Sequence, residues 1–198
     1  MSQALLQQLV QSLQCLPGVG NKTAQRMAYH LLQHKRVAGV ELSKVLQSAM
    51  ENIQHCNTCR NYTEHDECEI CTNTKRKISA EMCIVESAAD LAAIEQSAQF
   101  SGVYFVLHGT LSPIDGIGPG EIGLPLLEEK LASNQYNEII LALNPSVEGE
   151  ATSHYIADIA KRYGVAVTKI AHGIPVGGEL EYVDSSTITH ALMGRKAI

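Results

Sequence analysis

Long apolar runs and targeting signals are missing from this sequence of 198 residues. No stretch approaches the roughly 18 apolar residues that a membrane-spanning helix needs. The first residues, MSQALLQQLVQSLQ, lack the basic start and the long apolar stretch of a signal peptide. Hydrophobic residues still make up 45% of the chain, which is enough to bury a real core. We therefore expect a soluble globular protein of the cytoplasm that has no membrane partner.

The common phosphate-binding motif of nucleotide-binding proteins, Gly-x-x-x-x-Gly-Lys-Ser/Thr, is also missing. The glycine-rich segment 108–123, HGTLSPIDGIGPGEIG, contains no lysine. We interpret it as a shaped loop and not as a nucleotide site. His108, His172 and His190 have no partner that the spacing identifies, and we expect ordinary core or surface histidines.

Acidic residues are scarce in the first part of the chain and abundant in the rest. Residues 1–80 contain nine Lys and Arg against six Asp and Glu, whereas residues 81–198 contain six against fifteen. The net charge of −6 therefore divides into +3 and −9. Such asymmetry is compatible with a basic end that meets phosphate and an acidic body that meets proteins, although an ordinary solvated surface gives similar counts.

Apolar residues recur at helical spacing in the first 53 residues. The pattern predicts a first helix through Leu16, a second from Asn21 to about Gln33 and a third from about Val40 to Ile53. Between the first two lies LPGVG, a tight turn after which Asn21 can cap the next helix.

From residue 80 onward, strand patterns alternate with helix patterns. The strands are MCIVE, GVYFVLHG, EIILALN and VAVTKIA, and the helices between them are SAADLAAIEQS, LPLLEEKLAS and GEATSHYIADIAKRYG. This alternation predicts a mainly parallel sheet in an α/β layer structure. Together with the helical start it predicts an α+β protein of several domains, with boundaries at 1–54, 55–78, 79–175 and 176–198. The last segment is predicted as a loop, an extended stretch and a short helix.

Four of the six cysteines form two Cys-x-x-Cys pairs, separated by eight residues: Cys56, Cys59, Cys68 and Cys71. Two such pairs supply the four thiolates of a tetrahedral zinc site, and a closed four-sulfur shell leaves no position for a catalytic water. Zinc-coupled folding, worth on the order of 10 kcal/mol, replaces the core that residues 55–77 lack. A redox dithiol pair, or a site that uses His55 or His65, is a less economical alternative. Cys15 and Cys83 lie in apolar segments, where we expect buried, inert thiols.

The turn Pro17-Gly18-Val19-Gly20 precedes a helix that carries Lys22 and Arg26 on one face. Its glycines let backbone N–H groups face outward, and the helix N-terminus adds its positive end, so an anion fits there. The segment resembles a helix-hairpin-helix, a module that binds DNA phosphates without reading bases. On steric grounds alone, the same glycines are equally typical of an ordinary tight turn that binds nothing. Five further basic residues are each expected to be solvated charges: Lys35, Arg36, Lys75, Arg76 and Lys77.

Glu86 ends one predicted strand, and Asn144-Pro-Ser146 ends a later one. These positions resemble the acidic motifs of the Toprim domain, in which a glutamate and an Asp-x-Asp hold magnesium for phosphoryl transfer. Here Asn144 and Ser146 stand at the two aspartate positions, and neutral oxygens are poor Mg²⁺ ligands. Glu148 and Glu150 follow, either as a partner-binding surface or as acids that stabilise a helix start.

In their order, the helix-hairpin-helix, the four-cysteine motif and the Toprim-like part resemble the RecR family of bacterial recombination mediators over essentially the whole chain. The segments that carry the resemblance are LPGVGNKTAQRMA, CNTC, CEIC, MCIVES, HGTLSPIDGIGPGEIG and NPSVEGEAT. The resemblance implies a ring-like homotetramer that clamps DNA independently of sequence, near the nucleoid during repair. It also implies that RecO and RecF act with the protein to load recombinase at single-strand gaps, without catalysis.

The resemblance assigns roles to particular residues. It places DNA contacts at the hairpin and after it, structural zinc at the four paired cysteines, and RecO contacts at the acidic segment. In order, these are Gly18, Gly20, Lys22 and Arg26; Cys56, Cys59, Cys68 and Cys71; and Glu148 and Glu150. The tail 176–198 is expected to make oligomer contacts. The alternatives are a metal-dependent Toprim nuclease or topoisomerase-like enzyme that uses Glu86, and a zinc-stabilised scaffold that never touches DNA.

Overall fold

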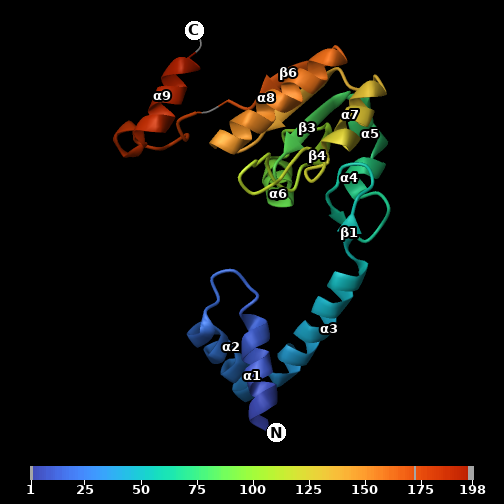
Figure 1. The fold of residues 1–198 in the computed structure, drawn as a ribbon. Coiled ribbons are helices and arrows are strands. Elements are labelled where there is room, and N and C mark those ends of the chain that lie inside the picture. The colour runs from blue at the N-terminus through green and yellow to red at the C-terminus, as the bar shows by residue number, and fades with distance from the viewer. Residues whose placement is uncertain (1, 172, 196–198) are drawn as a thin grey trace. The chain divides into compact units, whose positions relative to one another are not determined.

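A computed structural model describes residues 2–171 and 173–195 of the chain, drawn as a ribbon in Figure 1. His172 and the last three residues of the predicted tail lie outside the described residues. The chain divides into two compact units with the boundary between Ile53 and Gln54. No helix in the described part is long and apolar enough to cross a membrane.

The first unit is entirely helical. It consists of α1 (Ser2–Leu13), α2 (Asn21–His34) and α3 (Arg36–Asn52). Ala24 and Ala28 of α2 are fully buried against Val10 of α1, because two small residues one turn apart let the helices approach closely. α3 begins four residues before the predicted start, since Lys35 both ends α2 and precedes α3 without a loop.

Two expectations about single residues of this unit are wrong. Cys15 is exposed, because α1 ends at Leu13 and the thiol lies in the following turn and not on the apolar stripe. Asn21 is the first residue of α2 and does not cap it. Gly20 occupies the capping position, and no side chain accepts a hydrogen bond there.

The second unit begins with the cysteine-rich segment. β1 (Gln54–His55) and β2 (Tyr62–Thr63), each two residues long, pair as an antiparallel hairpin. Two short helices follow, α4 (Glu69–Thr72) and α5 (Thr74–Ile78). The only buried cluster within this segment, among described residues, is formed by the four paired cysteines. The segment therefore lacks an ordinary apolar core, as predicted.

A four-stranded sheet forms the body of the second unit, and the predicted parallel pairing is confirmed. Its strands, in the spatial order β4-β3-β5-β6, are all parallel. The bounds are β3 (Glu81–Val85), β4 (Val103–Val106), β5 (Glu138–Ala142), β6 (Ala166–Lys169), α6 (Ala88–Ser97), α7 (Leu124–Ala132) and α8 (Val147–Arg162). The tail contains a 3-10 turn, η1 (Leu180–Tyr182), and the predicted final helix, α9 (Ser185–Met193).

Both faces of the sheet are covered by helices, as parallel sheets require. Met82 and Ile84 pack with the apolar residues of α7 and α8, whereas Cys83 and Val85 pack with Leu91 of α6 on the other face. Figure 1 shows α8 and α6 on opposite sides of the sheet. This alternation follows from the period of two along a strand. Cys83 is buried, as expected.

The connections between the strands indicate which edge of the sheet is suited to bind a ligand. The chain passes from β3 to its neighbour β4 through α6, and from β5 to β6 through α8 on the opposite face. The winding therefore reverses between β3 and β5. In such sheets, ligands bind outside the carboxyl ends of the strands at this reversal. Glu86 follows β3 there, and Asn144 lies just beyond β5.

Candidate nucleic-acid interface and zinc centre

The turn between α1 and α2 leaves its backbone open to solvent. Gly18 has φ +76°, a left-handed conformation that glycine adopts without strain. Gly20 precedes α2 in an extended conformation, and a side chain at either glycine would meet no atom within 4 Å. The first N–H groups of any helix lack intrahelical partners. Without a capping side chain, those of α2 are available to an anion.

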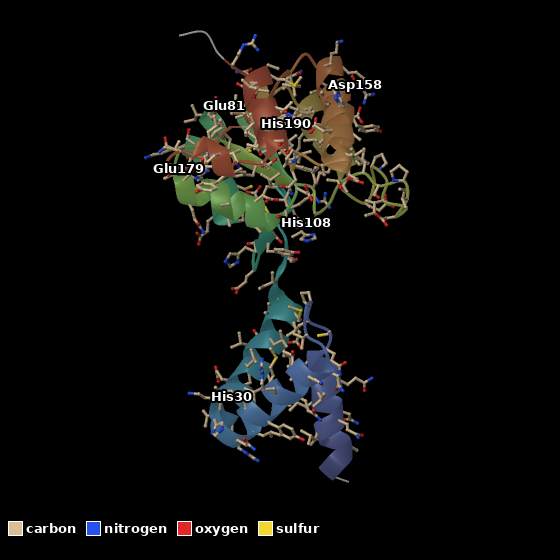
Figure 2. The ribbon with its side chains drawn as sticks, turned by 90° about the vertical axis from the view of Figure 1, so that its left-hand side faces the viewer. His30, Glu81, His108, Asp158, Glu179 and His190 are labelled. Carbon is tan, nitrogen blue, oxygen red and sulfur yellow. The ribbon has the colours of Figure 1, made fainter. Side chains whose placement is uncertain are left out.

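Lys22 and Arg26 lie on the same open face of α2. Both are exposed, and neither forms an ion pair with another described residue. They line a shallow hollow of about 410 Å³. The other lining residues are Gln25, Tyr29, His30, Gln33 and His34, of which His30 is labelled in Figure 2. Residues 1–53 contain five Lys and Arg against two Glu, so the unit that holds this face is basic.

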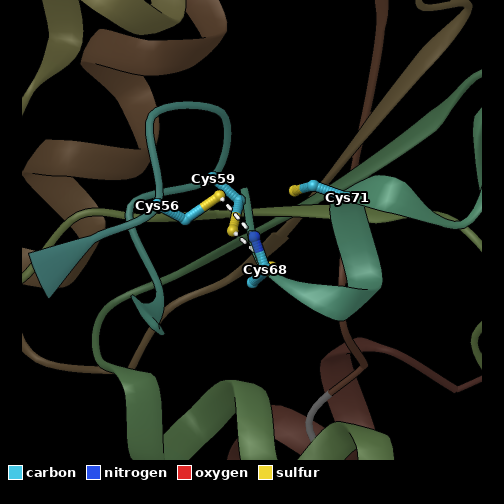
Figure 3. Close-up of side chains that lie close together, drawn as sticks. All are labelled: Cys56, Cys59, Cys68 and Cys71. Atoms are coloured by element: carbon cyan, nitrogen blue, oxygen red, sulfur yellow. Dashed lines mark hydrogen bonds between the residues drawn. The ribbon is translucent and has the colours of Figure 1, made fainter. Parts of the chain in front are cut away.

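The four paired cysteines converge in the second unit. Their sulfur atoms all lie within 4.8 Å of one another, and all four residues are buried (Figure 3). A tetrahedral zinc with Zn–S bonds of about 2.3 Å needs sulfur atoms about 3.8 Å apart. The Sγ atoms of Cys59 and Cys68 are 3.5 Å apart. The donor set therefore fits Zn²⁺, and a metal there has a structural role.

Backbone N–H groups support this cluster from outside. The N–H of Cys68 donates to Sγ of Cys56 at 3.3 Å, and the N–H of Asn61 donates to Sγ of Cys59 at 3.4 Å. Such contacts stabilise negative sulfur and orient metal ligands. Arg60, at φ +64°, turns the chain between Cys59 and the donor Asn61.

The thiols of the cysteine cluster differ in pKa. A hydrogen bond with Cys71 is the main cause that lowers the pKa of Cys59 to about 6, whereas burial raises the pKa of Cys68 to about 11. The same hydrogen bond and burial raise the pKa of Cys71. Zinc binding must displace the protons that remain, so its affinity falls as the pH falls.

Arg60 also fastens the cysteine-rich segment to the sheet. Its Nη1 donates to the carbonyl oxygens of Leu107, at 3.2 Å, and Ile122, at the two ends of the glycine-rich loop. The N–H of Val106 donates to the carbonyl of Cys59 at 2.8 Å. The loop predicted from its glycines is therefore shaped by the zinc segment.

Arg76 departs from the prediction that it is a solvated charge. Its guanidinium forms a two-point ion pair with Glu95, at 2.7 and 3.0 Å, and donates to the carbonyl of Gly102 at 3.0 Å. Tyr104 donates to the same carboxylate at 2.7 Å. Arg76 thus holds α5 against α6 and β4.

A ring cluster that the sequence did not predict lies beside the zinc segment. The rings of His55 and His108 stack with their centroids 4.3 Å apart, and the Tyr62 ring lies 5.2 Å from each. Nε2 of His108, which Figure 2 labels, lies 2.6 Å from the carbonyl oxygen of Arg60. His55 is therefore engaged outside the cysteine cluster. The one available signal was His108 next to a glycine directly after a strand.

At the strand ends that resemble a magnesium site, the side chains form local hydrogen bonds and an ion pair. Nδ2 of Asn144 donates to Oε2 of Glu86 at 2.9 Å. Ser146 caps α8, because its Oγ accepts the N–H of Gly149 at 3.0 Å. Glu150 forms an ion pair with Lys169. An amide and a hydroxyl in local hydrogen bonds thus stand at the two aspartate positions.

Comparison with protein families defines the class. Residues 6–50 match the RecR helix-hairpin-helix, 53–73 the RecR four-cysteine zinc finger domain, 80–171 a Toprim domain and 173–196 the RecR C-terminal family. The protein is therefore a Toprim-fold protein that carries a helix-hairpin-helix and a structural four-cysteine zinc finger. Because all four matches occur in one chain, the chain belongs to the RecR family. These domains support a role as a mediator in DNA recombination and repair.

Proposed function

We propose that the protein is a non-catalytic DNA-binding mediator of recombinational repair. In this proposal it acts as a clamp-like homotetramer with RecO and RecF and helps to load recombinase at single-strand gaps. Residues 1–54 bind DNA, 55–78 provide the zinc-stabilised segment, 79–175 form the Toprim body and 176–198 make oligomer contacts. The observation that carries the proposal is the open basic face of α2 behind an uncapped glycine turn.

The chemistry of this face favours phosphate over base edges. Lys22, Arg26 and the first N–H groups of α2 donate hydrogen bonds or carry positive charge, which matches the backbone of DNA in any sequence. Two side-chain cations per chain make a weak site when alone. Several copies that hold one DNA molecule together bind far more tightly, because each later contact becomes intramolecular.

Exposed apolar side chains support an assembled state. No residue of α3 is buried, even though the helix carries several apolar side chains. Val37, Val45 and Met50, for example, are 86%, 57% and 73% exposed. In the tail, Val176 is fully exposed and Tyr182 is 80% exposed. Apolar surface of this extent is typical of interfaces. Light scattering of the purified protein, with and without DNA, is expected to give the mass of a tetramer; a monomer under both conditions would exclude a clamp.

The acidic start of α8 is the proposed contact for RecO. Glu148 is exposed, whereas Glu150 already pairs with Lys169. We expect Glu148→Lys to abolish RecO binding and Glu129→Lys, the same reversal on α7, to leave it unchanged. Loss of thermal stability without loss of RecO binding would instead assign Glu148 to the helix dipole alone.

The DNA-binding step is tested with the full-length protein and fluorescent DNA of several unrelated sequences. We expect similar affinities for all sequences, and a loss of about tenfold or more when Lys22 and Arg26 are both replaced by alanine, since two phosphate contacts are removed. Lys44→Ala removes one cation from α3 and serves as the matched control. An unchanged affinity of the double variant would remove α2 from the DNA site.

The non-catalytic assignment is tested by incubating DNA with the protein and Mg²⁺ or Mn²⁺. The hydrogen-bonded Asn144 and Ser146 leave Glu86 without two carboxylate neighbours. We therefore expect intact DNA. Cleavage or relaxation that Glu86→Gln abolishes would replace this proposal with a Toprim enzyme.

A further inference from the structure

Tyr29 on α2 is a large aromatic side chain that the helical core does not use. It is 44% exposed and does not belong to the apolar cluster around Ala24 and Ala28. Within residues 2–171 and 173–195 its hydroxyl has no hydrogen-bond partner, and its ring contacts no other ring or cation. It lies three residues after Arg26 and four after Gln25, so all three share one side of the helix.

Two hollows meet at this side chain. The basic hollow that contains Lys22 and Arg26 includes Tyr29 and Gln25 in its lining. A second hollow, of about 570 Å³, lies between α1 and α2 and is also lined by Tyr29 and Gln25. The rest of its lining is mostly amide side chains, with two apolar ones: Gln7, Gln11, Gln14, Asn21, Leu6 and Val10. A cationic surface and an amide surface therefore adjoin across one tyrosine.

This arrangement matches the parts of an unpaired nucleotide. Lys22 and Arg26 suit its phosphates, an exposed phenol ring offers a stacking surface, and amides offer both donors and acceptors to a base edge. The bases of an intact duplex are stacked on each other, so the ring reaches them only where a strand is single or gapped. The positive charge beside the ring favours a polyanion over an ordinary peptide segment.

We propose that Tyr29 is a stacking platform for an unpaired base, and that it gives the helical unit a preference for single-stranded or gapped DNA over duplex. The inference rests on the proposed DNA-binding function and adds a specificity-determining residue to it. Gln25 and the amides of α1 contact the edge of the stacked base.

The test measures affinities of the full-length protein for labelled oligothymidylate and for a duplex of equal length. Tyr29→Ala is expected to weaken single-strand binding by about 5- to 150-fold, the range for loss of one base–aromatic stack. Duplex binding is expected to change far less. The slope of log affinity against log salt stays as in the unmodified protein, because stacking releases no counterions. Tyr29→Phe retains the ring and should restore the strand preference.

Tyr155→Ala is the matched control, since Tyr155 is also 44% exposed but lies on α8 of the other unit. Equal losses on both DNA forms, or no loss, would overturn the role of Tyr29 while leaving DNA binding by α2 intact. If Tyr29→Ala keeps the preference for single-stranded DNA but no longer binds an acidic protein partner, the stacking role is overturned and Tyr29 is part of a protein-docking site. Failure of the unmodified protein to bind either DNA would overturn the proposed function, and this inference with it.

Discussion

Nδ2 of Asn144 donates a hydrogen bond of 2.9 Å to Oε2 of Glu86, across the carboxyl ends of β5 and β3. This contact lies where the winding of the sheet reverses, the position at which α/β proteins bind ligands. It gives the Glu86 carboxylate a neutral partner in place of a second acid that would share a cation with it. This edge of the sheet therefore has the position of a magnesium site but lacks the carboxylates that would bind the ion. The basic α2 remains the better candidate for contact with DNA.

Asn144→Asp should destabilise the protein by about 1–2 kcal/mol, because it removes the donor and places two carboxylates in contact. Millimolar Mg²⁺ should restore part of the loss, since a cation can bridge the pair. Thermal unfolding with and without Mg²⁺ measures both effects. Ser146→Asp is the control, because aspartate also caps a helix and should keep the stability of α8. Equal melting temperatures for Asn144→Asp and the unmodified protein would contradict this account.

Gly123→Ala should be more destabilising than Gly116→Ala. Both glycines have left-handed backbone, with φ of +76° and +71°, so alanine adds strain of about 1 kcal/mol at each. Only at Gly123 would the new methyl group also overlap the Arg60 guanidinium. Displacing that group breaks its hydrogen bonds to the carbonyls of Leu107, Glu121 and Ile122, a further cost of about 1–3 kcal/mol.

Urea unfolding of the two variants, alone and combined with Arg60→Ala, measures this contact. The excess cost of Gly123→Ala should disappear once Arg60 is removed, because the two residues then no longer interact. The same excess with and without Arg60 would show that the guanidinium does not fasten the loop.

Zinc should control the reactivity of four of the six thiols. Cys15 is exposed and is expected to react at once with a thiol reagent in the zinc-loaded protein. Chelation should release the four cysteines of the buried cluster, and only unfolding should release Cys83. Counting the thiols modified in native, chelated and denatured protein measures this order, with Cys15→Ser as the control for the fast class. Several fast thiols in protein that retains its zinc would contradict the four-sulfur site.

Stability should fall at alkaline pH partly because of Cys83. Burial raises the pKa of this thiol from 9.0 to about 12. Between these values the unfolded chain loses the proton while the folded chain keeps it, so the unfolded state binds fewer protons. Stability from this group is therefore complete below pH 9.0 and is lost as the pH rises towards 12, by at most about 1.4 kcal/mol per pH unit.

Cys83→Ala should flatten this part of the curve of unfolding free energy against pH. Tyr104, whose pKa burial raises and the Cys83 thiol raises further, remains in both proteins, so Cys83→Ala removes the loss from the thiol and also reduces the loss from Tyr104. Parallel curves for the variant and the unmodified protein would exclude Cys83 as a source of the alkaline loss.

Local patterns were sufficient to predict most of the fold and the zinc centre. The alternation from residue 80 onward predicted β3 to β6, since parallel strands buried on both faces appear as short apolar runs between helices. The two Cys-x-x-Cys pairs predicted the metal ligands, because each pair is complete within four residues. Ser146 was compared only with a metal ligand, whereas its capping role follows from the helix that begins at the next residue.

Contacts between distant segments could not be predicted. Arg60 meets Ile122 and His55 meets His108 only after the zinc segment packs on the end of β4, and no period in the sequence connects them. Arg76 was expected in water for the same reason, because its partner Glu95 lies on a different helix. Cys15 was misjudged because α1 ends two residues before it, and ends are the least certain part of a predicted helix.

We propose that α2 binds DNA through phosphate. The most direct test is the salt dependence of DNA affinity for the full-length protein and for the variant in which Lys22 and Arg26 are both alanine. We expect log affinity to fall linearly with log salt, and the slope of the variant to be smaller by about 2 for each bound subunit on duplex DNA. Equal slopes for the two proteins would contradict phosphate binding by Lys22 and Arg26.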